Sequence, residues 1–230
     1  MKNITLIPEL KSNHVILECF EGGLVEAPDG SKHKLHSNTA IPNANALYSL
    51  IRERRPVKVV EIGMAFGGST LAILKALSDN GYGRLVSMDP YVGWLEAEEI
   101  AKHQVARAGW TQLHTHLKIP SFQGLAEMFI AGDKADLVYI DGFHRYDYAF
   151  SDAFLADKIL AGGGVLGFND CGWRSVHRAI LNFLVDNLYR EIQVGIPRSY
   201  AARNRLFALV KRMQGRSIYD RYFEKVERKE

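Results

Sequence analysis

One stretch decides the fold of this chain: Val57-Lys58-Val59-Val60-Glu61-Ile62-Gly63-Met64-Ala65-Phe66-Gly67-Gly68-Ser69-Thr70. A short β-branched run is followed by a glycine-rich turn, and a Ser-Thr pair then opens a helix. Strand, tight turn and helix in this order form the place where nucleotide-like ligands bind in an open α/β sheet. Glycines let the backbone turn sharply, and the first helical turn points free N–H groups at an anionic end of the ligand.

The turn departs from two well-known phosphate-binding patterns. The dinucleotide fingerprint has glycine at its first, third and sixth positions, which here are Gly63, Ala65 and Gly68. Alanine therefore replaces the glycine that lets a pyrophosphate approach the backbone. No Gly-Lys-Ser/Thr follows, so the turn is not a Walker-type loop either.

Composition bounds the class of protein. The 230 residues are 47% apolar and 24% charged, which is typical of a globular protein with one sizeable core. The net charge is +3 and the basic residues are spread along the sequence, so we expect no nucleic-acid partner. Two cysteines make no disulfide framework, and no run approaches the roughly 20 apolar residues that span a bilayer. We expect a cytoplasmic protein without a membrane partner.

Strands and helices alternate along most of the chain. Residues 1–41 form a polar arm with a hairpin at Asp29-Gly30, and an amphipathic helix follows until Pro56. We expect further strands at 84–89, 113–117, 136–141, 165–170, 191–194 and 206–210, and helices at 70–78, 96–108, 121–130, 146–160 and 175–186. Alternation predicts a parallel sheet with helices on both faces, and the last two strands predict an antiparallel hairpin at one edge. The glycines at 162–164 close a helix in this prediction, and residues 213–230 are a charged extension with a helix near its end.

Polar residues follow the strands at their carboxyl ends, where ligands bind in such sheets. Asp89 is placed to accept hydrogen bonds from ribose hydroxyls, although a helix cap or a turn with Pro90 would also explain it. Asp141 and Asn169 end strands that we expect to be neighbours. Oxygen ligands from two adjacent strand ends form a site for a hard cation that keeps open positions for substrate.

Two motifs resemble a known family. Glu-x-Gly-x-x-x-Gly-x-Ser, from Glu61 to Ser69, resembles the first motif of the class I S-adenosylmethionine-dependent methyltransferases, and its wording is closest to the catechol O-methyltransferase-like branch. Asp-Gly-x-His-x-Tyr, from Asp141, followed by Gly-Gly and by Asn-Asp, is similar to metal-dependent O-methyltransferases of the catechol and macrolide-sugar types. The resemblance covers residues 42–212 and implies a Rossmann-like, seven-stranded, mostly parallel sheet whose last strand is antiparallel.

The resemblance also implies roles for single residues. The cofactor S-adenosylmethionine would be bound by Glu61, Gly63, Gly67, Ser69, Asp89 and Ser121. Mg²⁺ would be held by Asp141, Asn169 and Asp170, although the family has two acids, or Asp then Asn, where this chain has Asn then Asp. Residues 1–41 would be a lid over the site. Glu61 is equally explained as a buried structural acid, and Ser69 as a helix cap.

Methyl transfer to oxygen requires that a hydroxyl be oriented and deprotonated. A metal that holds two vicinal oxygens lowers the pKa of the hydroxyl, and a nearby imidazole accepts the proton. His144 is the candidate base, with Asp141 beside it; alternatively, His144 only begins the next helix. We expect a Mg²⁺-assisted O-methyltransferase that acts on a hydroxylated sugar or natural product. A homo-oligomer of this chain is compatible with that expectation. The alternatives are a metal-independent methyltransferase, an NAD-binding oxidoreductase, which Ala65 disfavours, and a non-catalytic cofactor-binding protein.

Overall fold

The structure, a computed structural model, describes residues 4–35 and 39–226. The chain forms two compact units, residues 1–120 and 121–230. The ends of the predicted arm and of the predicted C-terminal extension lie outside the described residues. The predicted boundaries after residues 41 and 212 stay predictions.

The first unit begins with the N-terminal arm. Two short helices, α1 (Pro8–Lys11) and α2 (His14–Phe20), precede a hairpin of β1 (Leu24–Glu26) and β2 (Lys32–Lys34). Asp29 shapes the hairpin turn, because its Oδ1 accepts hydrogen bonds from the backbone N–H and the hydroxyl of Ser31, at 2.9 and 2.6 Å. The hairpin predicted at Asp29-Gly30 is confirmed.

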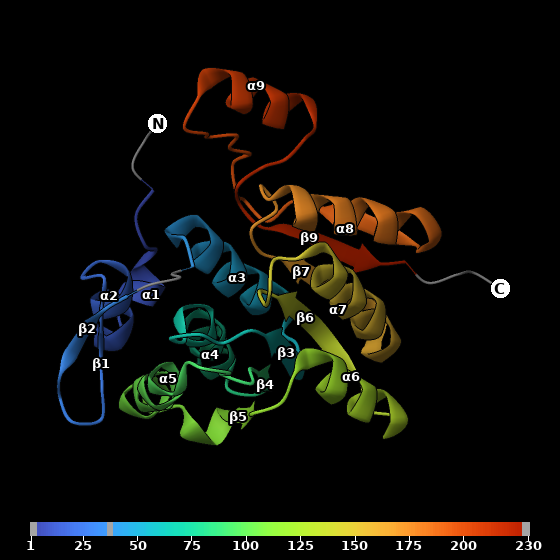
Figure 1. Ribbon diagram of the computed structural model, residues 1–230. Coiled ribbons are helices and arrows are strands. Elements are labelled where there is room, and N and C mark those ends of the chain that lie inside the picture. The colour runs from blue at the N-terminus through green and yellow to red at the C-terminus, as the bar shows by residue number, and fades with distance from the viewer. Residues whose placement is uncertain (1–3, 36–38, 227–230) are drawn as a thin grey trace. The chain divides into compact units, whose positions relative to one another are not determined.

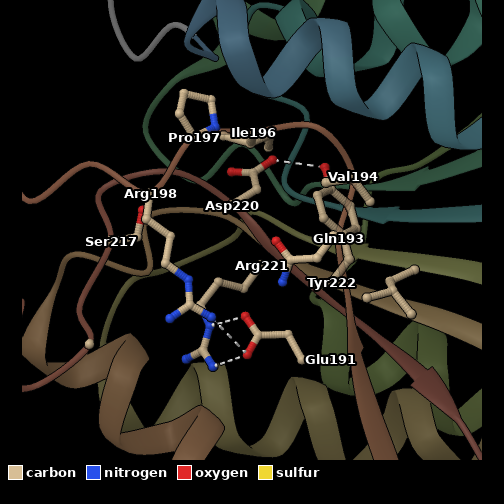
Figure 2. Close-up of a pocket in the computed structure, with 12 residues that line it drawn as sticks. Glu191, Gln193, Val194, Ile196, Pro197, Arg198, Ser217, Asp220, Arg221 and Tyr222 are labelled. Carbon is tan, nitrogen blue, oxygen red and sulfur yellow. Dashed lines mark hydrogen bonds and ion pairs between the residues drawn. The ribbon is translucent and has the colours of Figure 1, made fainter.

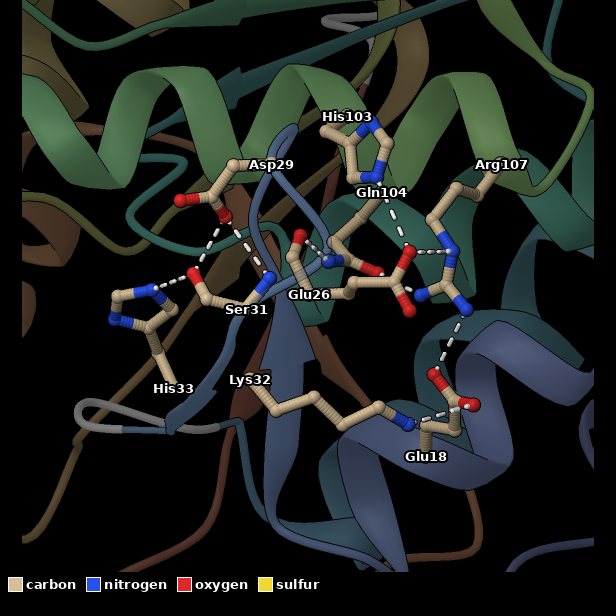
Figure 3. A network of polar contacts seen from close by, with 9 residues as sticks. All are labelled: Glu18, Glu26, Asp29, Ser31, Lys32, His33, His103, Gln104 and Arg107. Carbon is tan, nitrogen blue, oxygen red and sulfur yellow. Dashed lines mark hydrogen bonds and ion pairs between the residues drawn. The ribbon is translucent and has the colours of Figure 1, made fainter.

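The arm is fastened to α5 (Leu95–Arg107) of the same unit by a polar network (Figure 3). The Arg107 guanidinium lies 2.9 Å from the Glu18 carboxylate and 3.2 Å from that of Glu26. Gln104 donates a hydrogen bond of 2.6 Å to the backbone carbonyl of Glu26. The hairpin and α2 are thus both tied to one helix, and closure of the arm as a lid stays a prediction.

The rest of the first unit alternates helices and parallel strands (Figure 1). Its elements are α3 (Ile41–Arg54), β3 (Lys58–Ile62), α4 (Gly68–Asn80), β4 (Arg84–Met88), α5, a 3₁₀ turn (Thr111–Leu113) and β5 (His114–Leu117). The strand order is β5-β4-β3, and β3 pairs with β4 in the register Val60↔Val86. The predicted end of the first long helix at Pro56 is confirmed, because Arg55 closes α3 in the left-handed conformation.

The second unit continues the alternation and then changes direction. Its elements are α6 (Ser121–Ile130), β6 (Ala135–Ile140), α7 (Tyr146–Ile159), β7 (Leu160–Phe168), α8 (Arg174–Asp186), β8 (Tyr189–Ile192), α9 (Arg205–Met213) and β9 (Arg221–Lys225). The strand order is β6-β7-β9-β8; β6 and β7 are parallel, and β9 is antiparallel to both of its neighbours. The predicted fold class, seven mostly parallel strands of which the last is antiparallel, is confirmed for the described residues, although the last strand is β9 and not residues 206–210.

Three details of the prediction are wrong. The glycines at 162–164 lie inside β7 and do not close a helix. Residues 206–210 form part of helix α9, and its first turn is capped by Asn204, whose side chain accepts a 2.8 Å hydrogen bond from Leu206 N–H. The expected C-terminal helix is strand β9, which buries Tyr222 and Phe223 against its neighbours. A short apolar run fits either a strand or a helix, and packing decided each case.

Buried aliphatic and aromatic side chains form the cores of the two units. In the first unit β3 contributes Val59 and Val60, and in the second unit Tyr139, Phe168 and Tyr222 are fully buried. In the part of the chain that the structure describes, no helix is long and apolar enough to cross a membrane.

Candidate active site

The glycine-rich turn joins β3 to α4 in the first unit. Gly63 and Gly67 have φ angles of 85° and 87°, and Ala65 is also left-handed at 46°. An alanine in this conformation costs about 1 kcal/mol, so the turn keeps a glycine-like path without its middle glycine. Gly67, the N-cap of α4, has no side chain that could cap the first-turn N–H groups, which are the groups that would meet an anionic ligand.

Asp89 holds this turn in place. One of its oxygens accepts hydrogen bonds from the N–H groups of Met64 and Ala65, both at 3.0 Å, and the other accepts one from Tyr91 N–H at 2.9 Å. The Tyr91 hydroxyl donates in turn to the Ala65 carbonyl at 2.6 Å. A carboxylate has about four lone-pair positions, so Asp89 keeps capacity for one more donor, such as a ribose hydroxyl.

Glu61 and Ser69 meet in the interior of the first unit. The Glu61 side chain is fully buried, and its carboxylate accepts hydrogen bonds from the hydroxyls of Ser69, Thr70 and Ser87 at 2.6 to 2.7 Å. The Ser69 hydroxyl donates its proton to Glu61, so the backbone N–H of Ser69 is the donor that remains for a cofactor carboxylate. Direct contact of Glu61 with a cofactor stays a prediction. In this structure Glu61 is a buried acid that accepts hydrogen bonds from three hydroxyls.

Ser121 opens α6 in the second unit and is buried. Its hydroxyl donates a 2.6 Å hydrogen bond to Asp152, and burial raises the pKa of Asp152 to about 6. Sequence analysis missed Asp152, because a single acid inside a helix carries no local signal. The predicted contact of Ser121 with an adenine edge stays a prediction.

His144 lies between two acidic side chains of the second unit. Its Nε2 is 3.1 Å from Asp170 Oδ2 and 3.7 Å from Asp141 Oδ1. The Trp173 ring stacks on the imidazole at 5.4 Å between centroids, and the Ser175 hydroxyl donates a 2.5 Å hydrogen bond to the His144 carbonyl. The loops after β6 and β7 thus bring together three of the predicted site residues, and two further residues position the ring.

The electrostatics of this cluster favour a protonated imidazole. Burial alone would lower the pKa of His144, but the neighbouring carboxylates of Asp141 and Asp170 outweigh burial and raise that pKa. Burial raises the pKa of Asp141 to about 6 and also raises that of Asp170. The cluster can therefore accept and hold a proton near neutral pH.

Asn169 belongs to a different network from its neighbour Asp170. Its side chain is buried, and its Nδ2 donates to the Tyr139 hydroxyl and to Asp220 Oδ1, both at 3.0 Å. The hydroxyls of Tyr139 and Tyr222 also donate to Asp220, at 2.8 and 2.9 Å. Burial raises the pKa of Asp220 well above its usual range. Sequence analysis missed Asp220, which is 51 positions beyond Asn169.

This donor arrangement does not fit the predicted Mg²⁺ site. The imidazole of His144 lies between the two carboxylates, where a cation that bridges Asp141 and Asp170 would have to bind. Asn169, the third predicted ligand, donates through its Nδ2 to Tyr139 and Asp220, and a cation would bind its Oδ1 instead. Across residues 4–35 and 39–226, no group of three or more His, Cys, Asp or Glu side chains has the geometry of a metal site.

Comparison with known families identifies the domain. Residues 60–171, from the buried part of β3 to the loop after β7, match the sequence profile of a family described as a methyltransferase domain. Residues 60–171 are therefore similar to a methyltransferase domain. The predicted resemblance to class I methyltransferases, and with it the prediction of an enzyme of this class, is confirmed. A comparison with curated protein sequences found no match.

Solved structures share the fold of this methyltransferase domain and of the segments around it. Cofactor-bound Rv0187 from MTB is 15% identical with a TM-score of 0.66, over 99% of this chain and 94% of that one. The O-methyltransferase from Bacillus cereus, in complex with SAH, is 13% identical with a TM-score of 0.63, over 98% and 94%. TomG from Streptomyces achromogenes, an O-methyltransferase of tomaymycin synthesis in complex with SAM, is 15% identical with a TM-score of 0.58, over 98% and 93%. Identities this low establish the fold alone.

Proposed function

We propose that this chain is an S-adenosylmethionine-dependent O-methyltransferase in which His144 accepts the proton of a hydroxylated small molecule. The observation that carries the proposal is the position of His144 Nε2, within 4 Å of both Asp141 and Asp170. The methyltransferase domain match supports the reaction class, and two structural relatives named O-methyltransferases support oxygen as the acceptor.

The turn from Gly63 to Ser69 and the carboxylate of Asp89 would hold the cofactor. The uncapped N–H groups at the start of α4 suit a carboxylate, and Asp89 has capacity left for a hydroxyl. When bound, S-adenosylmethionine supplies an electrophilic methyl group on a sulfonium. The protein's task is then to position the acceptor oxygen and to remove its proton.

His144 performs the proton transfer in this proposal. A hydroxyl becomes more acidic as its oxygen forms the bond to carbon, and its proton passes to the imidazole. Asp141 and Asp170 then stabilise the imidazolium, as the raised pKa of His144 indicates. Nε2 faces the two carboxylates and is shielded from solvent, so the neutral imidazole carries its hydrogen there and Nδ1 is the nitrogen that accepts the proton.

A pocket in the second unit is the candidate binding site for the acceptor (Figure 2). Val194, Ile196 and Pro197 supply apolar walls, and the paired side chains of Glu191 and Arg221 supply a charged end. The pocket also contains Asp220, whose other contacts lead to Asn169 and so to the residue next to Asp170. This lining suits a small molecule that has both apolar and polar parts.

The metal-independent form of the reaction is the one that we propose, because His144 already occupies the position between the carboxylates. The test measures transfer of a labelled methyl group from S-adenosylmethionine to a panel of catechols, sugars and phenols, with and without EDTA. We expect turnover to survive the chelator. Loss of turnover that Mg²⁺ restores, and that Asp141→Ala abolishes, would instead favour the metal-assisted form. Failure to transfer methyl to any hydroxyl in the panel, together with transfer to an amine, would overturn O-methylation.

A further inference from the structure

The segment between β8 and β9 concentrates positive charge. Residues 192–219 contain no Asp or Glu, whereas the whole chain has a net charge of only +3. The basic residues of this segment are Arg198, Arg203, Arg205, Lys211, Arg212 and Arg216. We refer to residues 192–219 as the basic segment. Basic residues occur along the whole sequence, but only in this tract do we note six of them without an Asp or Glu among them.

Helix α9 in the middle of the basic segment is amphipathic, and its apolar face is exposed. At 100° per residue, the apolar side chains fall on one side of the helix and the basic ones on the other. No residue of α9 is buried. The exposed fractions of its apolar residues are 65% for Leu206, 65% for Phe207, 53% for Leu209, 36% for Val210 and 79% for Met213.

The helix projects from the strands of its unit on two long connections (Figure 1). Some of the arginines of the basic segment contact other parts of the protein, and others do not. Arg198 lies 3.6 Å from Glu191, and Arg216 donates to the Gly172 carbonyl. Within residues 4–35 and 39–226, Arg205 and Arg212 make no ion pair, and exposed apolar side chains lie beside them on the same helix.

We propose that α9 and the basic segment bind the surface of a membrane that contains anionic lipids. A helix with a large apolar face and a basic opposite face lies in the plane of the membrane interface, with its apolar side chains among the acyl chains. Lys and Arg near that plane are attracted by acidic headgroups. Phe207, Met213 and the two arginines meet both requirements at once.

Two other occupants fit this surface less well. A second copy of the chain, placed face to face in a symmetric dimer, would bring two basic segments without acids together. A nucleic acid would be attracted by the charge but would gain little from an exposed apolar face. An anionic lipid surface is complementary to both the charge and the apolar face.

The experiment is co-sedimentation of the full chain with vesicles. We expect binding to vesicles of equal parts phosphatidylcholine and phosphatidylglycerol, and binding weaker by about 30-fold or more to phosphatidylcholine alone or in 1 M salt. The double variant Arg205→Gln/Arg212→Gln should bind about 30-fold more weakly, at about fivefold for each charge removed. Phe207→Asp/Met213→Asp should abolish binding.

Ile130→Asp is the matched control, because Ile130 is 83% exposed at the end of α6, outside the basic segment. It should bind vesicles like the unchanged protein. Each variant is checked by thermal unfolding, and exposed positions should leave the melting temperature unchanged. Absence of binding, equal binding to both kinds of vesicle, or normal binding of Phe207→Asp/Met213→Asp would overturn the proposal. A lipid-free dimer that this variant dissociates would also overturn it and would identify a second copy as the occupant.

Discussion

His144 is the residue whose surroundings say most about chemistry. Two carboxylates approach one ring nitrogen, Trp173 stacks on the ring, and Ser175 fixes the backbone carbonyl. An imidazole that only started a helix would not need a carboxylate on its own loop and another on the loop after β7. The arrangement orients the ring and raises its affinity for a proton, which is what a general base requires.

His144→Ala should therefore lower kcat by about 10² to 10⁴-fold, the usual contribution of a general base, with little change in KM. The measurement is steady-state methyl transfer at saturating cofactor. His177→Ala is a useful comparison, because His177 is another buried histidine of this unit that contacts neither Asp141 nor Asp170 in the described residues. An unchanged kcat for His144→Ala would exclude its role as the base.

Asp170→Asn should change the pH dependence of the reaction. The base must be neutral, so kcat rises with pH through the pKa of His144, which its two acidic neighbours raise above 6.5. Removal of one negative charge lowers that pKa, and the rising limb of the kcat profile should move to lower pH. Asp147→Asn is the control, because Asp147 is exposed and pairs with Arg145. A limb that stays in place would show that another group controls the profile.

At the scale of secondary-structure elements, one buried carboxylate links three of them. Glu61 on β3 accepts hydrogen bonds from Ser69 and Thr70 on α4 and from Ser87 on β4. The loop that would meet the cofactor starts two residues after Glu61. The position of the turn thus depends on an acid that does not need to touch the ligand.

Glu61→Ala should lower the free energy of unfolding by about 3 kcal/mol, because three buried hydroxyls lose their acceptor. Glu61→Gln should cost less, since the hydroxyls can rotate to satisfy an amide of the same shape. Denaturant unfolding measures both values. Glu99→Ala, at a side chain that is 65% exposed, should change stability by less than about 0.5 kcal/mol. Equal losses for the alanine and glutamine variants would contradict a hydrogen-bonding role.

At the scale of the whole molecule, cofactor binding should be visible as stabilisation. S-adenosylhomocysteine at 100 times its Kd should add about 2.7 kcal/mol to the free energy of unfolding. For a chain of this size, that corresponds to a rise of about 5 to 10 °C in Tm. NAD at the same concentration should give no shift, because Ala65 replaces the glycine of the dinucleotide fingerprint. A shift with NAD alone would contradict the cofactor assignment.

Much of the architecture was predictable because its signals are local. The β-branched runs, the glycine turn after Ile62 and the alternation of helices and strands need only neighbouring residues to be recognised. The approach of Asp141 and Asp170 to one another was also predictable, since carboxyl ends of parallel strands meet at one edge of a sheet. The charge excess of the basic segment is likewise present in the sequence itself.

Tertiary structure decided where side chains point and whether a short apolar run forms a helix or a strand. Asn169 turns its amide nitrogen inward because Asp220, 51 positions away, offers a buried acceptor. Leu206 to Val210 form a helix, and Asn204 caps its first turn. Local sequence determines which chemical groups are present and the period at which they recur. The partners of these groups come from distant parts of the chain, and only folding brings them within hydrogen-bonding distance.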